Sequence, residues 1–353
     1  MGLNSISIAN FRGIASPLSV RLAPITLIGG RNNSGKSTIL EAIRLLAGRR
    51  DASIPAEVNA VSRKIALRVR EDLQTLFFDE KEAVNISATM DTKRTCAVSI
   101  RLQKKAEGEI SSTETHDTSL VKSTRWELVQ VGEDVDADGH KRERTSRLTP
   151  RVEEEGKFGY TTNKAESEID WGCELMSASS RGAAETNEIF SQMTVALQDR
   201  EISAVINKIY PEIFTVKLVD SQLMVKVRGI EKLLPAKIAG DGVVRMISVL
   251  CAMWKCPGGT LCVDEIDNGL HYSVLKDFWH AVADFSKKFN VQLVATTHHL
   301  ELLETLSKMV VETGDYERAE YVRISHAETG HSVSIFGGKD LERALKLGFE
   351  LRG

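Results

Sequence analysis

The sequence lacks any apolar run long enough to cross a membrane. The longest, Met246 to Trp254 with Ser248 inside it, is far shorter than the roughly 20 residues that a membrane-spanning helix requires. Residues 1–10 alternate polar and apolar side chains and do not show a charged start followed by an apolar core, so no secretory signal is expected. We therefore expect a cytoplasmic protein without a membrane partner.

Paired cysteines and an excess of one charge are also missing. The 5 cysteines are an odd number without a CxxC pair, which argues against a disulfide framework or a structural zinc site and favours reduced, mostly buried thiols. Lys and Arg number 46 against 49 Asp and Glu, and the net charge of −3 gives no overall sign of polyanion binding. Any nucleic-acid contact must come from a local basic patch.

The chain is instead strongly patterned at both ends. A length of 353 residues corresponds to about two average domains, or to one large domain with an insertion. Alternating apolar residues at 6–11 and 18–22 predict a hairpin, and residues 24–30 predict a short strand that runs into a glycine-rich loop and a helix. Because the middle of the chain is polar and weakly periodic, we expect an inserted α+β segment at 93–184, with 1–92 and 185–353 forming one discontinuous head.

The second half alternates helices and strands, which implies a largely parallel sheet. The expected elements are a helical stretch over 188–210, a β section over 214–227, a helix over 243–254, strands at 260–266 and 291–297 with a helix over about 273–289 between them, a hairpin over 321–336 that turns at 328–330, and a short helix over 341–347.

The segment after the first apolar strand fits a phosphate-binding loop. Gly30-Arg31-Asn32-Asn33-Ser34-Gly35-Lys36-Ser37 matches the pattern GxxxxGK[ST] between an expected strand and an expected helix. Glycines let such a loop curl so that backbone N–H groups point at phosphate oxygens, and the helix N-terminus adds partial positive charge. Lys36 would reach the β and γ phosphates and Ser37 would ligate Mg²⁺, so the loop predicts ATP or GTP binding. The alternative is a chance glycine turn before a helix.

Two acids follow a later apolar strand, as they do in a Walker B strand. In Leu261-Cys262-Val263-Asp264-Glu265 we predict that Asp264 holds Mg²⁺ and that Glu265 orients and polarises the attacking water. The alternative is two solvated acids at a strand end.

The third buried strand ends in His298 and His299. A histidine at this place could donate a hydrogen bond to the γ phosphate. The stretch between Asp264 and His298 is long enough for one crossover helix and a parallel strand, which supports His298 in that role. Either histidine could instead cap the strand at the surface, and this is the favoured interpretation for His299.

Together these motifs resemble the ABC-type ATPase heads of the SMC, RecN and OLD-nuclease branch. The resemblance is carried by Ile8-Ala9-Asn10-Phe11-Arg12-Gly13, by the phosphate loop continued through Thr38, by Asp264-Glu265-Ile266-Asp267-Asn268-Gly269-Leu270-His271, and by Ala295-Thr296-Thr297-His298. Within this branch the chain is most similar to stand-alone ATPases related to the OLD proteins, which are often found in bacterial anti-phage operons. The resemblance implies an α/β P-loop NTPase fold, an ABC-type head with a mixed, largely parallel sheet and an inserted α+β segment.

The resemblance further implies a homodimer of heads around ATP, in which the phosphate loop of one copy meets the signature motif of the other. Gly240-Asp241-Gly242 lies one helix before Asp264, where that motif is expected. The serine expected before the glycines is missing, because Lys237, Ile238 and Ala239 occupy its place, and this predicts slow hydrolysis. No Q-loop glutamine is identifiable. The residues assigned to the nucleotide are Gly30, Asn32, Asn33, Ser34, Gly35, Lys36, Ser37, Thr38, Gly240, Asp241 and Gly242, with Lys36, Glu265 and His298 as catalytic residues and Ser37 and Asp264 as Mg²⁺ ligands.

The expected function is that of an ATPase subunit that regulates or scaffolds a separate effector. OLD nucleases carry a Toprim nuclease domain after the ATPase, and residues 299–353 leave no room for one. We therefore expect the effector, a nuclease or a toxin acting in anti-phage defence, to be another protein. The alternative is an SMC- or RecN-like DNA-binding ATPase in repair or chromosome maintenance, although no sustained apolar heptad is found between the phosphate loop and Asp264.

The middle segment offers two further features. Asp134-Val135-Asp136-Ala137-Asp138-Gly139 begins like a calcium loop, but its twelfth position is Thr145, so a hairpin turn at Asp138-Gly139 is the favoured interpretation. A self-contained nuclease using the acids of 134–138 is a weaker alternative. The basic residues of the segment leave DNA contact open, although such runs are more often a solvated face; they are Arg101, Lys104, Lys105, Lys141, Arg142, Arg144 and Arg147.

Overall fold

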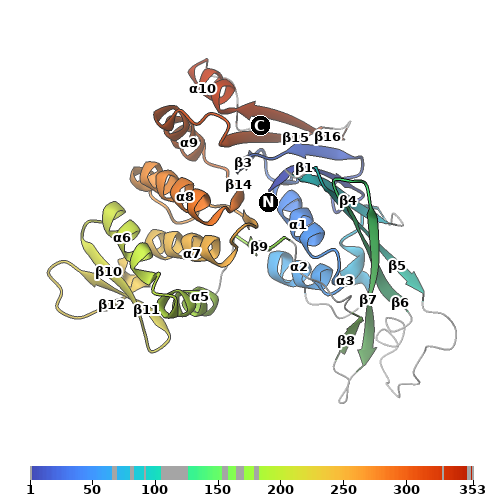
Figure 1. The fold of residues 1–353 in the computed structure, drawn as a ribbon, viewed down its shortest axis with the longest axis horizontal. Helices are drawn as coiled ribbons and strands as arrows, with labels where there is room; N and C mark the ends of the chain where they lie inside the picture. Colours follow the sequence, from blue (N-terminus) through green and yellow to red (C-terminus); the bar gives the residue numbers. More distant parts are fainter. Residues whose placement is uncertain are drawn as a thin grey trace.

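The computed structural model describes most of the chain and shows an α/β fold (Figure 1). The described residues are 2–65, 70–79, 83–90, 93–104, 126–152, 158–163, 171–178, 183–327, 330–347 and 351. Lys105 and the turn residues Glu328 and Thr329 lie outside them. No helix of the described part combines the length and the apolar character needed to cross a bilayer.

A six-stranded sheet holds the motif-bearing segments, in the order β16-β15-β3-β14-β13-β9. All its neighbouring pairs are parallel except β15 with β16, which confirms the expected mixed, largely parallel sheet. Because the carboxyl ends of parallel strands lie at one edge, the segments that follow β3, β13 and β14 meet there. The strands are β3 (Ile25–Gly29), β9 (Cys173–Met176), β13 (Thr260–Val263), β14 (Gln292–Thr296), β15 (Ala319–Ala327) and β16 (Gly330–Gly337).

Helices cover both faces of this sheet (Figure 1). The strands β3, β13 and β14 are buried throughout, as expected for a parallel sheet between two layers. Leu261 and Leu293 face one core, whereas Cys262 and Val294 face the other, because successive side chains of a strand point to opposite faces. The helices are α1 (Lys36–Ala47), α2 (Ile54–Arg63) and α3 (Arg70–Gln74) in one layer, and α5 (Ala183–Val195), α6 (Asp199–Ile209), α7 (Asp241–Lys255), α8 (Leu275–Phe289), α9 (Leu300–Thr313) and α10 (Gly338–Lys346) in the other.

A second, antiparallel sheet of seven strands has the order β2-β1-β4-β5-β6-β7-β8. Its pairing of β1 with β2 confirms the N-terminal hairpin. The strands β5 to β8 belong to the segment expected as an insertion, yet they extend the sheet of β1, and β9 from the same segment pairs with β13. The division into a head and an insertion stays a prediction, and its boundaries cut across both sheets. The strands are β1 (Leu3–Ala9), β2 (Leu18–Arg21), β4 (Val84–Met90), β5 (Thr95–Lys104), β6 (Trp126–Val135), β7 (Lys141–Val152) and β8 (Phe158–Asn163).

The turn between β6 and β7 is a hairpin, as favoured over a calcium loop. The carboxylate of Asp136 accepts hydrogen bonds from the backbone N–H groups of Asp138 (3.0 Å) and His140 (2.9 Å), which fixes the turn. Asp134 is committed elsewhere, because Arg49 and Arg50 donate to its carboxylate. Asp136 and Asp138 do lie together with His140, with their ligand atoms within 4.8 Å of one another, so a nuclease using these acids stays the weaker alternative.

A small three-stranded sheet packs with α5 and α6. It consists of β10 (Ile213–Val219), β11 (Gln222–Val227) and β12 (Leu234–Pro235), and it leads through a 3₁₀ turn, η2 (Ala236–Ala239), into α7. The segment around the expected signature motif is therefore held between this sheet and α7.

Candidate functional site

The phosphate loop joins the end of β3 to the start of α1, as its sequence predicts. Gly30, Asn33 and Gly35 have positive φ angles of 143°, 62° and 95°, which glycine and asparagine tolerate best. A Cβ at Gly30 would clash with the carbonyl oxygen of Ile324 on β15, so the loop depends on glycine at this place. Residues 32–38 line one cavity of about 810 Å³ together with Asp264, Glu265 and His298.

Polar groups of the loop are arranged to receive an anion. The Nζ atom of Lys36 donates to the carbonyl oxygens of Gly30 and Arg31, both at 2.8 Å, and so lies within the curl of the loop. Burial lowers the pKa of Lys36, while the charges of Asp264 and Glu265 oppose that shift. The Oγ atom of Ser34 is buried and has no hydrogen-bond partner among the described residues. A buried hydroxyl without a protein partner fits a phosphate-binding loop.

Ser37 and Asp264 meet across the cavity from segments far apart in the chain. The Ser37 Oγ atom lies 3.0 Å from both carboxylate oxygens of Asp264. Thr296, at the end of β14, donates to the Oδ1 atom of Asp264 at 2.5 Å and accepts from the backbone N–H of Glu265 at 2.8 Å. Hydroxyl and carboxylate oxygens at one place are the donors that Mg²⁺ prefers, so these residues fit a magnesium site.

Glu265 and His298 face each other at the edge of the cavity. Glu265 has a φ of 47°, a left-handed conformation that turns the chain directly after Asp264. Its Oε1 atom lies 3.9 Å from the Nε2 atom of His298, and both side chains are partly exposed. Burial and the charge of Lys36 lower the pKa of His298, while Glu265, Asp267 and Asp264 oppose the shift. His298 is therefore mostly neutral at pH 7 and keeps one N–H donor.

Two residues to which the sequence assigned no role support the segments that carry these side chains. Arg245 of α7 donates through Nη2 to the backbone carbonyls of Asp264 and Glu265, both at 2.9 Å. Asp267, which is buried, accepts from Thr297 at 3.0 Å and lies 3.7 Å from the Nε2 atom of His299. Arg245 gives no signal in the sequence, since it is one polar residue within an apolar helix.

Basic residues that the sequence did not assign to the site complete the cavity wall. Arg12 and Arg63 line it, and both pair with Glu41, a buried carboxylate of α1. His331 of β16 lines it as well. Arg12 belongs to a quoted motif, but its approach to the phosphate loop depends on the fold and was not predicted.

The residues of the expected signature motif lie outside this cavity. Gly240, with a φ of 122°, precedes α7, and Asp241 is exposed. Gly242 packs closely on the loop after β13, since a Cβ there would lie 2.7 Å from the carbonyl oxygen of Gly269. Ile238 beside it is 68% exposed. Gly240 and Asp241 thus reach the surface, whereas Gly242 is buried. The role assigned to these residues in the site of a second copy stays a prediction.

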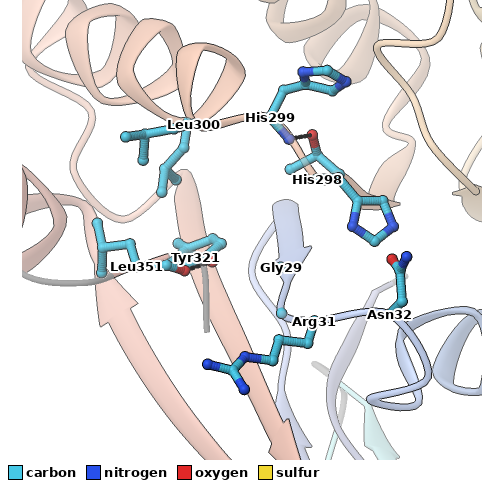
Figure 2. A pocket seen from close by; sticks show the side chains of 11 residues that line it. Gly29, Arg31, Asn32, His298, His299, Leu300, Tyr321 and Leu351 are labelled. Carbon is cyan, nitrogen blue, oxygen red and sulfur yellow. Dashed lines mark hydrogen bonds between the residues drawn. The ribbon is translucent and has the colours of Figure 1, made fainter.

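A second cavity of about 520 Å³ adjoins the phosphate loop (Figure 2). Asn32 and His298 line both cavities. The Figure also shows His299 at the start of α9, where its backbone N–H donates to Thr297 at 3.0 Å. The hydroxyl of Tyr321 donates to the carbonyl of Leu351 at the back of this cavity. His299 thus begins a helix, in line with the surface interpretation.

A strand, a phosphate loop and a helix beside an acidic strand end define the class of P-loop nucleotide hydrolases.

Solved structures of SMC heads share the fold. The SMC head bound to the C-winged helix domain of ScpA has a TM-score of 0.53 at 14% identity, covering 98% of this chain and 99% of that chain. The SMC head domain with an extended coiled coil, bound to the C-terminal domain of ScpA derived from Pyrococcus furiosus, has a TM-score of 0.51 at 13% identity, covering 99% of each.

The family follows from matches to related sequences. Residues 25–304 match the family described as AAA domain, putative AbiEii toxin, Type IV TA system, and the chain belongs to this family. An ATP/GTP phosphatase of Helicobacter pylori (strain ATCC 700392 / 26695) is 24% identical over 330 residues, which cover 88% of this chain and 89% of that protein. The chain is thus a nucleotide-binding P-loop ATPase with an SMC-head-like fold, whereas its place in the OLD-related branch stays a prediction.

Proposed function

We propose that the chain hydrolyses ATP in the 810 Å³ cavity between its phosphate loop and the end of β13. The observation that carries this proposal is the convergence of Lys36, Ser37 and Asp264, with the Ser37 hydroxyl 3.0 Å from the Asp264 carboxylate. The loop amides, the Ser34 hydroxyl and Lys36 would bind the phosphates. Ser37 and Asp264 would hold Mg²⁺, whose charge when bound offsets part of the phosphate charge.

Glu265 and His298 are placed for the hydrolytic step. Glu265 is partly exposed at the cavity and can accept a hydrogen bond from the attacking water, which orients it for in-line attack. His298, held neutral by its surroundings, can donate its N–H to a γ-phosphate oxygen. Arg245 fixes the backbone from which Glu265 projects. The cavity thus places a water-orienting carboxylate opposite a phosphate cradle.

The experiment compares two variants of the full chain. Lys36→Ala should abolish ATP binding, because it removes the cation within the curl of the loop. Glu265→Gln should keep ATP affinity and lose hydrolysis, because the amide is a poor base of the same shape. ATP affinity measured by calorimetry and phosphate release give the result. Equal ATP affinity in Lys36→Ala and the unsubstituted protein would refute the assignment.

We further propose that two copies pair around ATP, with Gly240, Asp241 and Gly242 of one copy facing the phosphate loop of the other. In support, Asp241 is exposed and Gly240 partly exposed, whereas Gly242 is buried. Exposed apolar residues lie nearby, Ile238 just before the motif at 68% exposure and Tyr272 shortly after Gly269 at 71%. Light scattering should show an ATP-dependent dimer of Glu265→Gln, and adding Ile238→Glu should dissociate it because a charge would be buried. Leu197→Glu is the matched control, since Leu197 is 83% exposed near the opposite end of α7. A monomer with ATP in every case would refute the pairing.

We propose that this ATP cycle controls a separate effector, a nuclease or toxin, in anti-phage defence. The support is the family description, which names a toxin and a Type IV TA system, together with the resemblance to OLD-related ATPases. The chain purified from its native host as Glu265→Gln should retain an effector that Lys36→Ala releases. Identical sets of co-purifying proteins for both variants would count against nucleotide control.

DNA binding of the SMC kind is the second candidate. The β-sheet register places Arg101, Val129 and Arg147 abreast on one face, where both arginines are exposed. However, Arg147 pairs with Glu127 and Lys141 pairs with Glu133, which lowers the positive charge of this face. Salt-dependent binding of duplex DNA by the purified chain, weakened by Arg101→Ala, would favour this function.

A further inference from the structure

The hairpin of β15 and β16 contacts the phosphate loop at both of its glycines. The carbonyl oxygen of Ile324 on β15 closely approaches Gly30 at the start of the loop. The imidazole of His331 on β16 lies over Gly35 at its end, with Nε2 3.5 Å and Cδ2 3.6 Å from the position that a Cβ would take there. The hairpin therefore carries a histidine side chain to the place where the loop enters α1.

His331 also forms part of the wall of the 810 Å³ cavity. Its side chain is half-buried, and its register partner across the hairpin is His326, whose ring centroid lies 4.4 Å away. The other charged or titratable groups around the same cavity are Arg12 after β1, Lys36 of α1, Arg63 of α2, Asp264 and Glu265 after β13, and His298 after β14. The acids are at the Ser37 side of the loop, and the basic residues prepare the cavity for a polyanion.

The surroundings of His331 disfavour its charged form. Burial lowers the pKa of His331, and the neighbouring His326 lowers it further. The imidazole is thus mostly neutral at pH 7. A phosphate group near Nε2 would reverse this balance, because an adjacent negative charge stabilises the protonated ring and a hydrogen bond to phosphate favours it further.

We propose that His331 is a further nucleotide-binding residue, whose imidazole donates a hydrogen bond to the phosphate chain where that chain passes Gly35. The inference rests on the nucleotide binding proposed above. It links affinity to pH, because the pKa of His331 is higher in the complex than in the free protein. The contribution to affinity is full below the pKa of the free protein and is lost as pH rises through the pKa of the complex.

ADP with MgCl₂ is the probe, because ADP carries phosphates for the loop and is not consumed. Calorimetric titration of the full chain gives the dissociation constant of ADP at pH 6 and at pH 8. The quantity compared between variants is the dissociation constant at pH 8 divided by that at pH 6. The titration of ADP itself contributes equally to every variant. We expect the ratio to fall by roughly three- to tenfold in His331→Gln, since one pKa unit corresponds to a factor of ten. His331→Arg should bind with the same ratio as His331→Gln but more tightly at pH 8, because its charge does not titrate.

His326→Gln is the matched control, since it removes the neighbouring imidazole and leaves His331 in place. It should keep the pH dependence and move it to higher pH, because the repulsion is gone. If His331→Gln does not fold, His331→Arg is compared with the unsubstituted protein instead. Calorimetry in two buffers of different ionisation enthalpy then measures how many protons each protein takes up on binding ADP. The unsubstituted protein should then take up more protons on binding than His331→Arg.

Equal pH ratios in the unsubstituted protein and His331→Gln, or equal proton uptake with His331→Arg, would overturn the inference. Lys36→Ala separates this failure from failure of the proposed function. If ADP binding depends on Lys36 and the ratio of dissociation constants is the same with and without His331, only the role of His331 is wrong. If the unsubstituted protein binds ADP at neither pH, nucleotide binding itself is wrong.

Discussion

Replacing Arg245 by alanine should slow ATP hydrolysis while leaving nucleotide binding nearly unchanged. The Nη2 atom of Arg245 donates to the carbonyl oxygens of Asp264 and Glu265, both at 2.9 Å, and these bonds fix the turn from which Glu265 projects. A hydrogen bond from a charged group contributes about 1.5–3 kcal/mol. The two bonds together would contribute about 3–6 kcal/mol. Because Arg245 is only half-buried, water can replace about half of this, and we expect a net loss of about 1.5–3 kcal/mol at the turn.

If most of that loss appears in the transition state, kcat falls by roughly ten- to a hundredfold, since 1.36 kcal/mol corresponds to a factor of ten. Arg245→Lys should recover part of the rate, because one ammonium can reach one carbonyl. ADP affinity, set by the phosphate loop, should change by less than about threefold.

The assay is steady-state phosphate release at saturating ATP, with ADP affinity and melting temperature measured on the same samples. Lys255→Ala is the control, because Lys255 lies at the other end of α7 and makes exposed ion pairs with Glu174 and Glu185. Such pairs contribute little, so that variant should keep its kcat. A folded Arg245→Ala protein with unchanged kcat would show that the turn does not need this support.

Three further changes test the site and the fold. Ser37→Ala should reduce the tightening of ADP binding by Mg²⁺ about tenfold or more in titrations with and without chelator, because it removes one proposed ligand. Trp279→Ala should lower the free energy of unfolding in urea by about 3–5 kcal/mol, since this buried side chain also donates to the carbonyl of Leu302. Asp134→Asn should cost a similar 3–5 kcal/mol, because the buried Arg49 loses its partner, whereas exposed Asp138→Asn should cost less than about 0.5 kcal/mol. Burial opposes ionisation of Asp134, but the hydrogen bonds from its arginine partners outweigh burial and lower its pKa. The stabilisation of the fold by this ion pair is therefore present above a pH of about 3.9, the pKa of an unfolded Asp, and is lost as pH falls through the lower pKa of the folded state.

The sequence was most informative where local pattern and burial agree. β3, β13 and β14 are short apolar strands followed by polar residues, and a parallel sheet necessarily brings their carboxyl ends together. The predicted order of phosphate loop, Asp264 and His298 therefore sufficed to predict their shared cavity. Strands β5 to β8 carried a weaker signal, because one of their faces is solvated and polar residues mask the alternation. The pairing of β5 with β4 depends on long-range hydrogen bonds that no local pattern encodes.

The missed residues of the site share one property, which is that they reach it from elements without a motif. Arg63 comes from α2, Arg245 from α7 and His331 from the edge strand β16. Each is one of several polar residues in its element, and its role depends on which elements pack against the loop. Positions of this kind follow from tertiary packing alone, so a single sequence gives no means of choosing them.

One of these residues, Arg245, connects the nucleotide cavity with the segment of the expected signature motif. Arg245 binds the backbone after β13 and is part of α7, whose first turn contains Gly242. Gly242 in turn packs against Gly269, which follows Asp267 in the same loop that Glu265 begins. The helix α7 therefore contacts the loop after β13 at two points, through Arg245 and through Gly242. Because α7 is one continuous helix, we expect a shift of the Glu265 turn on hydrolysis to displace the start of α7 as well. If two copies pair around ATP as proposed, weakening these contacts at Arg245 should uncouple ATP turnover from that pairing. The ATP-dependent dimer of Arg245→Ala should then persist longer than that of the unsubstituted protein.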